Sequence, residues 1–155
     1  DWHQFRNSNI PTTTNQSSSD NPGNGAFIKA GSGTNGNWRD PTNNSLWAGV
    51  SGTNNPCPTG WRIPTKAEWY SFMINNSGNN TRRISIGMAI GSVLKLPASL
   101  ARSRIDATVT AGNNHMYWMN NSDTGTAWSI NFYDGGWGEG SGTEAYGAAV
   151  RCIQN

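Results

Sequence analysis

Charge of either sign is scarce along this chain of 155 residues. Eleven Lys and Arg and nine Asp and Glu leave a formal net charge of +2, and the only basic run is Arg82-Arg83. Nucleic-acid binding needs positive side chains clustered on one surface, so this class of partner is excluded. Apolar residues make up 34% of the chain, and no apolar run is long enough to span a bilayer. We therefore expect neither nucleic-acid binding nor direct insertion into a membrane.

Motifs for catalysis or metal binding are also missing. The two histidines, His3 and His115, belong to no paired-histidine or His/Cys cluster of the kind that binds zinc. There is no GxSxG, phosphate-loop or dinucleotide-binding motif, and the acidic residues are scattered, not paired. Loops rich in Asn and Asp supply oxygen ligands, but none has EF-hand spacing. We expect a protein that is not an enzyme and has no cofactor, with structural calcium as the one open alternative.

Cysteine is nearly absent, since Cys57 and Cys152 are the only two. They do not form a CxxC pair, which argues against zinc and against a thioredoxin-like site. Two alternatives remain: a disulfide that ties the first third of the chain to its end, or two buried thiols. We favour the disulfide, for which chain-entropy models give about 4–5 kcal/mol. It would indicate an extracytoplasmic setting.

The chain is rich in Gly, Asn, Ser, Thr and Trp instead. Disordered chains usually combine few aromatics with high net charge, whereas this one has 8 Trp and little net charge. We therefore expect a folded protein with long ordered loops, and the length suits a single domain over residues 1–155. Because the chain begins at Asp1 and not at Met, we expect it to be the C-terminal part of a longer protein.

The clearest predicted element is a helix over about residues 65–75. Thr65 is a favourable N-cap, and Glu68 three residues later completes a capping box. Ile63, before the cap, should pack back on the helix as a hydrophobic staple. The polar run Asn75–Gly78 should end the helix. Apolar residues recur at helical spacing and predict one buried face: Trp69, Phe72 and Met73.

Several short strands are predicted around this helix. The segments are Ala26–Ile28, Val93–Leu96, Met116–Met119, Trp128–Tyr133 and Ala145–Ile153. The glycine-rich stretch Gly135–Gly142 indicates a loop, so the last two segments should form an antiparallel hairpin with a long tip. One good helix with scattered short strands makes an α+β domain.

Alternation within the two last strands predicts which side chains share a face. In the first of them Trp128, Ile130 and Phe132 should face one side, and Ser129, Asn131 and Tyr133 the other. In the second, one face should hold Tyr146, Ala148, Val150 and Cys152.

The region from Leu100 to Glu144 has the composition of a recognition surface. Tyr, Asn, Ser and Gly with some Trp and Arg are the residue types that supply rigid aromatic area and adaptable hydrogen bonds. The candidate ligand-binding residues are Arg102, Arg104, Asn113, Asn114, His115, Tyr117, Ser129, Asn131, Tyr133, Asp134 and Trp137. The alternative is that these stretches are ordinary solvated loops.

The chain contains NPCPTGWRIPTKAEW, LKLP, Tyr117-Trp118 and AYGAAVRCI, preceded by WHQFRNSNI, DNPGNGAFI, NWRDP and SLWAGV. In this combination and order the stretches resemble the major paralogous domain family first described in Fibrobacter succinogenes, over nearly the whole chain. The resemblance implies a C-type lectin-like fold used as a binding module in surface and secreted proteins of bacteria and their phages. Some members of this broad group are variable proteins of diversity-generating retroelements, in which C-terminal positions are mutagenised on a fixed scaffold.

On this resemblance, the outward residues of Trp128–Tyr133, together with Asp134 and Trp137, would face a ligand. Independently of the resemblance, we expect Trp61 and Trp69 to fill the core. Compared with the reactive cysteines of the related enzymes, Cys57 and Cys152 look like framework. The chain departs from the animal C-type lectins, because Trp118-Met119-Asn120 stands where a calcium-dependent sugar motif would have WND. This departure argues against sugar binding through calcium.

Together these patterns predict a non-enzymatic recognition module of a phage tail fibre or of a bacterial surface or pilus protein. It would be extracellular, at the cell surface or on a virion, and would bind a cell-surface glycan or protein receptor. Oligomerisation would come through the parent protein. The alternative is a structural or accessory domain of a secreted surface protein that has no selected ligand.

Overall fold

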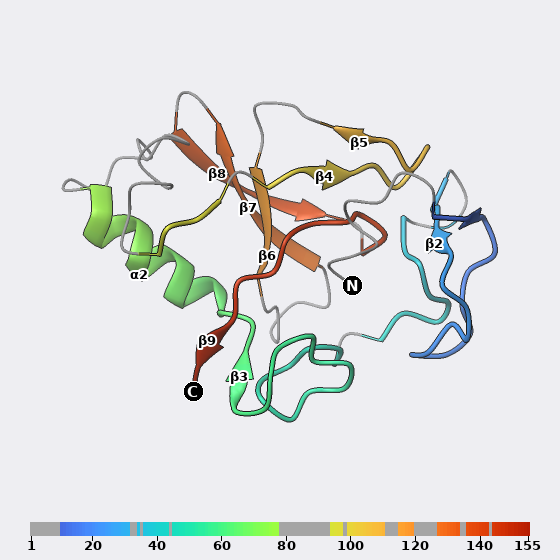
Figure 1. Ribbon diagram of the computed structural model, residues 1–155, viewed down its shortest axis with the longest axis horizontal. Coiled ribbons are helices and arrows are strands. Elements are labelled where there is room, and N and C mark those ends of the chain that lie inside the picture. Colours follow the sequence, from blue (N-terminus) through green and yellow to red (C-terminus); the bar gives the residue numbers. More distant parts are fainter. Residues whose placement is uncertain are drawn as a thin grey trace.

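The computed structural model describes residues 10–31, 34, 36–43, 45–77, 94–97, 99–110, 115–119, 127–133, 136–142 and 144–155. Within them it has one helix and several short strands (Figure 1), which confirms the mixed α+β class. The helix is α2, Lys66–Ser77. The strands are β1 (Thr12–Thr13), β2 (Phe27–Ile28), β3 (Trp61–Arg62), β4 (Ala101–Arg102), β5 (Val109–Thr110), β6 (His115–Met119), β7 (Ala127–Tyr133), β8 (Gly136–Gly142) and β9 (Ile153–Gln154).

The centre of the fold is a three-stranded antiparallel sheet in the order β6-β7-β8, with α2 on one side of it (Figure 1). We call the side that packs against α2 the inner face and the opposite side the outer face. A single core cluster joins the helix to the inner face: Trp69, Met73, Leu96, Tyr117, Met119, Ile130, Phe132, Trp137 and Ala149. The predicted alternation in β7 is confirmed, because Ile130 and Phe132 are buried in this cluster and Trp128 packs against it.

Strand β8 corrects the prediction of a glycine-rich loop after β7. It pairs with β7 along its whole length, from Ala127↔Gly142 to Tyr133↔Gly136, so the hairpin partner of β7 is β8 and not the last segment of the chain. The glycines of GWGEGSG fall at every second position, so they all share the outer face. The inner face receives Trp137, which packs in the core. Glycine content suggested a loop, but the period of two is that of a strand.

The segment after β8 is also less regular than predicted. Of the expected strand Ala145–Ile153, only Ile153 lies in a strand. It belongs to β9, Ile153–Gln154, which pairs antiparallel with β3. Further back, single bridges join Gly147 to Arg102 and Ala149 to Tyr117. The buried side chains are Ala145 and Ala149, whereas the four residues expected to share one face are all half-buried. Isolated bridges do not maintain the two-residue alternation on which that prediction depended.

The predicted strand Val93–Leu96 is corrected as well. Val93 lies outside the described residues, and Leu94–Leu96 is not a strand. Lys95 has a φ of 47°, a left-handed conformation that interrupts an extended chain. Leu96 is still buried in the core cluster.

The start of α2 has the predicted capping box. The backbone N–H of Thr65 donates to Glu68 Oε2 at 2.8 Å, and the N–H of Glu68 donates to Thr65 Oγ1 at 3.3 Å. Arg62 adds a fork, with Nη1 and Nη2 donating to the two carboxylate oxygens at 2.8 and 2.7 Å. The hydrogen bonds from Arg62 and then Thr65 hold the pKa of Glu68 down, at about 2, against the opposing effect of burial. Glu68 therefore joins β3 to the first turn of the helix.

Lys66 ties the same turn of the helix to the sheet. Its Nζ lies 2.8 Å from Glu139 Oε2 on β8 and 3.9 Å from the centre of the Trp128 ring on β7. A lysine in the first turn of a helix is unfavourable to the helix dipole. The carboxylate and the indole face offset this, and they fix the angle at which α2 meets the sheet.

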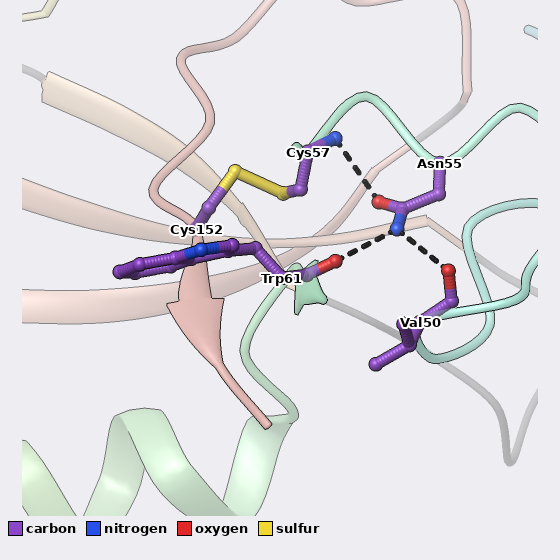
Figure 2. Close-up of a disulfide and its surroundings, with 5 residues drawn as sticks. All are labelled: Val50, Asn55, Cys57, Trp61 and Cys152. Carbon is purple, nitrogen blue, oxygen red and sulfur yellow. Dashed lines mark hydrogen bonds between the residues drawn. A yellow bond between two sulfur atoms is a disulfide. The ribbon is translucent and has the colours of Figure 1, made fainter. Parts of the chain in front are cut away.

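Cys57 and Cys152 form the disulfide that the sequence favoured, with Cα atoms 5.8 Å apart and a sequence separation of 95. Figure 2 shows how Asn55 supports the first cysteine: its Oδ1 accepts from the N–H of Cys57 at 3.1 Å. Its Nδ2 donates to the carbonyls of Val50 and Trp61 at 3.0 and 2.9 Å. The bridge therefore joins a loop with its own hydrogen bonds to the segment that leads into β9.

Trp61 corrects one expectation about this region. Its side chain is 39% exposed and extends toward the disulfide (Figure 2), so it is not a core residue. As a residue of β3, paired with Gln154 at the lower edge of the molecule in Figure 1, it lies outside the helix–sheet core. Trp69 is buried as predicted.

Removing the disulfide should lower the free energy of unfolding by about 2–5 kcal/mol, because the open chain has more conformational freedom when unfolded. Urea denaturation of the oxidised protein, the reduced protein and the double variant Cys57→Ala/Cys152→Ala measures this. The double variant should be insensitive to reductant. Equal urea midpoints for the oxidised protein and the double variant would contradict the prediction.

The charge of Glu68 should stabilise the fold in a pH-dependent manner. Its pKa is about 2 in the folded protein and near 4.5 when unperturbed, so the stabilisation is present above pH 4.5 and is lost as the pH falls toward 2. Glu68→Gln keeps a capping side chain but removes the charge. The difference in Tm between wild type and variant should be largest near neutral pH and vanish near pH 2. A difference that does not change with pH, or that persists fully in an Arg62→Gln background, would argue against this role.

Candidate binding surface

The outer face of the sheet carries the polar half of the alternation in β7. Ser129, Asn131 and Tyr133 point to this face, because Ile130 and Phe132 between them are buried on the inner one. The neighbouring strands complete the outer face with Met116 and Trp118 from β6 and with Gly136, Gly138, Gly140 and Gly142 from β8. These outer-face positions include no Asp, Glu, Lys, Arg or His.

The glycines of β8 leave room for the side chains of β7 to lean across them. A Cβ at Gly138 would lie 3.3 Å from Tyr133 Oη and 3.4 Å from Tyr133 Cε1. A Cβ at Gly140 would lie 3.3 Å from Asn131 Nδ2 and 3.5 Å from Ser129 Oγ. Glycine inside a strand normally weakens it, and an aromatic side chain laid across the glycine restores part of the lost packing. Tyr133 is the aromatic side chain that lies across Gly138.

Tyr133 combines exposure with a fixed position. Its side chain is 38% exposed, although its hydroxyl donates to the carbonyl oxygen of Trp137 at 3.0 Å. The hydrogen bond fixes the far end of the ring and the contact with Gly138 supports its edge. Within the described part of the chain, no group donates to the Tyr133 oxygen, so this oxygen keeps its acceptor capacity.

Ser129, Asn131 and Tyr133 lie in a row along the outer face, and their exposure increases from Ser129 to Tyr133. Asn131 Nδ2 donates to Ser129 Oγ at 3.4 Å, and Ser129 Oγ donates to the Gly140 carbonyl at 3.5 Å. Ser129 is buried and Asn131 is half-buried. The Oδ1 of Asn131 has almost no exposed surface and no hydrogen-bond partner among the described residues. The row is therefore most exposed at its Tyr133 end.

The other end of the outer face is covered by the loop that carries Trp47. The rings of Trp47 and Trp118 meet edge to face, with centroids 6.3 Å apart and an interplanar angle of 62°. The N–H of Trp47 donates to the Thr53 carbonyl at 2.9 Å, which closes the loop. Trp118 is buried as a result. The accessible part of the outer face is the part around Tyr133.

Four predicted ligand-binding residues are buried, which corrects their expected surface role: Arg102, Tyr117, Ser129 and Trp137. Tyr117 and Trp137 belong to the inner face. The Tyr117 hydroxyl donates to the Pro97 carbonyl, and burial raises the pKa of this phenol. Trp137 packs its ring against Tyr70 of α2, with centroids 5.4 Å apart. Both were predicted to contact a ligand because of their residue type. Each occupies a position of its strand that faces the core.

The two predicted arginines hold the β4–β5 hairpin in place. Arg102 is 1% exposed, its Nε donates to the Ala107 carbonyl at 3.0 Å, and its guanidinium lies 4.6 Å from the Phe27 ring centre. Desolvation lowers the pKa of this guanidinium. Arg104 donates through Nη1 to the Ala30 carbonyl at 2.7 Å. Both side chains therefore contact the N-terminal part of the chain.

The arginines are not brought together with Tyr133. The bridges at Gly147 and Ala149 place the last segment of the chain between β4 and β6, and β6 in turn separates that segment from β7. Asn113, Asn114 and Asp134 lie outside the described residues, and His115 is described only as the residue of β6 that pairs with Phe132. Of the predicted set, the outer face therefore unites Ser129, Asn131 and Tyr133.

The structure gives no support to a metal centre in the described part of the chain. No group of three or more His, Cys, Asp or Glu side chains is placed there to hold an ion. Two carboxylates do share a positive neighbour: Asp20 lies 2.8 Å from Arg39, and burial raises the pKa of Glu144 while Arg39 opposes the shift. The Arg39 guanidinium therefore interacts with both carboxylates.

Sequence reasoning missed the glycines that shape the surface. Gly138 and Gly140 were assigned to a loop, although GWGEGSG has the period of a strand. It also missed the exposed Ile105 at the β4–β5 turn, which is 61% exposed. No pattern marks such a position, because its exposure depends on the turn around it.

Comparison with protein-family models, with curated proteins and with solved structures finds no match for this chain. None of the helices in the described residues is long and apolar enough to cross a membrane. The disulfide is a feature of proteins that fold in oxidising compartments.

Gly138 and Tyr133 should be energetically coupled. Gly138→Val should be more harmful in the wild type than in a Tyr133→Ala background, because the new side chain occupies the space of the ring only when the ring is present. A double-mutant cycle on urea unfolding should give a coupling free energy within about 0.5–3 kcal/mol. Additive effects of the two changes would show that the ring does not depend on the glycine.

Proposed function

We propose that this protein is a non-enzymatic recognition module that binds a cell-surface glycan or protein receptor through the outer face around Tyr133. The observation that carries the proposal is the exposure of a fixed aromatic ring beside an amide, over strands that the core holds rigid. Binding surfaces favour such rings, since they offer large area with little conformational entropy to lose.

The separation of scaffold and surface supports the proposal. The disulfide, the Arg62–Glu68 fork and the helix–sheet core contain the strongest constraints, and none of them includes Tyr133 or Asn131. Changes at these two outward positions would leave the core intact. This is the property expected of a domain whose ligand contacts vary on a fixed framework.

The wider setting of the proposal comes from the sequence. The resemblance to the major paralogous domain family suggests a C-type lectin-like fold, in a phage tail fibre or in a bacterial surface or pilus protein. A disulfide fits an extracellular, cell-surface or virion location. Diversification by a retroelement would act on the outward positions of β7.

A structural or accessory domain without a selected ligand is the second candidate. It is favoured by the burial of Arg102, Tyr117, Ser129 and Trp137, which removes four residues from the expected contact surface. The two candidates differ in what happens when Tyr133 is lost.

Tyr133→Ala should weaken binding by at least about tenfold, because an exposed aromatic side chain that becomes buried on binding contributes much of the binding free energy of a small interface. The probes are a glycan array and a panel of intact bacterial cells, each read with fluorescently labelled protein. The variant should unfold within a few degrees of the wild type, since it loses one surface hydrogen bond and partial packing.

Ile105→Ala and Trp61→Ala are matched controls, because these are the other two exposed large hydrophobic side chains of the described residues. Both should bind like the wild type. If the wild type binds no array component and no cell, or if Tyr133→Ala binds as well as the controls, the accessory-domain alternative is correct.

A further inference from the structure

The accessible part of the outer face is small and uncharged. Within the described residues it consists of Tyr133, Asn131, Met116, Gly138 and Gly140, because Trp47 and Trp118 close the other end. A stable protein–protein interface buries about 800 Å² on each partner and takes some 20–30 residues. The accessible residues that the structure describes are far fewer than this, and they offer contacts for a ligand of one or two rings.

The chemistry of the patch suits a neutral ligand that carries hydroxyl groups. A charged ligand would lose its hydration on this face without meeting an opposite charge, since the described outer-face positions have no ionisable acid or base. The side chain of Tyr133 is 38% exposed, C–H groups are attracted to the π system of such a ring, and its oxygen can still accept from a hydroxyl. A pyranose has both an apolar C–H face and a rim of hydroxyls.

We infer that the ligand of this surface is a neutral glycan, bound without calcium, with one pyranose ring on the Tyr133 ring and one of its hydroxyls donating to Tyr133 Oη. This rests on the proposed function and narrows its glycan-or-protein alternative to one class. The Tyr133–Trp137 hydrogen bond and the Gly138 contact are what hold the ring in place before the sugar arrives.

The test is a titration of the disulfide-bonded protein with neutral hexopyranose oligosaccharides, alongside sialylated and sulfated oligosaccharides of matched length. Chemical shifts of the protein report binding, and multivalent display on an array compensates for the weak affinity of single sugars. We expect binding of one or more neutral glycans, unchanged by a calcium chelator and by added salt.

The variants separate stacking from hydrogen bonding. Tyr133→Ala should weaken neutral-glycan binding by at least about tenfold. Tyr133→Phe should weaken it by about two- to tenfold, because Phe keeps the ring but loses both the acceptor oxygen and the hydrogen bond to Trp137. Ile105→Ala should bind within about twofold of the wild type.

Three results would overturn the inference. They are preference for the anionic glycans with loss of binding in salt, abolition of binding by the chelator, and binding of neutral glycans that Tyr133→Ala does not weaken. If no glycan binds, but Tyr133→Ala still abolishes attachment to protease-sensitive sites on cells, the neutral-glycan inference fails while the recognition function stands. If the Tyr133 variants change neither glycan nor cell binding, both fail.

Discussion

The packing of α2 against one face of a sheet only three strands wide determines most of this fold. Trp69 lies 6.0 Å from Tyr117 between ring centres, Tyr117 lies 6.2 Å from Phe132, and Tyr70 meets Trp137 at 5.4 Å. Because strand side chains alternate, burying these rings decides which residues of β6, β7 and β8 must face the other way. The outer face is therefore a consequence of the core, and the direction of Tyr133 follows from the burial of Phe132 beside it.

The remaining constraints act at the edges of this layer. Arg62, Glu68 and Thr65 join β3 to the start of the helix, and Arg62 Nε also donates to Asn155 Oδ1 at 3.0 Å. The disulfide attaches the same region to Cys152, so both ends of the last segment are held: one at β3 and the other by the bridges to β4 and β6. Segments distant in the sequence meet here with few regular strand-to-strand hydrogen bonds, so side-chain hydrogen bonds and the disulfide hold them together.

The sequence predicted those parts of the structure that depend on interactions between residues close together in the chain. Thr65 and Glu68 stand three positions apart and cap the helix, and the alternation around Ile130 and Phe132 gives β7 and its faces. Composition was misleading where the spacing of the residues was ignored. The glycines of β8 suggested a loop, although they recur at every second position, as in a strand. The burial of Arg102 could not be predicted, because it depends on Phe27 and Ala107 arriving from other parts of the chain. For the candidate site, the outward direction of Asn131 and Tyr133 was predictable, whereas the inward direction of Trp137 depended on recognising β8.

The row of glycines on β8 has a consequence for how this surface tolerates change. A neighbouring strand with side chains would require every replacement on β7 to match it in shape, so most substitutions would carry a packing penalty. On the β8 side Asn131 and Tyr133 meet only the main chain of glycines, whereas on the β6 side Met116 lies beside Asn131. On the β8 side, a replacement at these positions therefore meets no side chain whose shape it must match. The glycines of β8 therefore restrict the side chains of β7 less than a neighbouring strand with side chains of its own would.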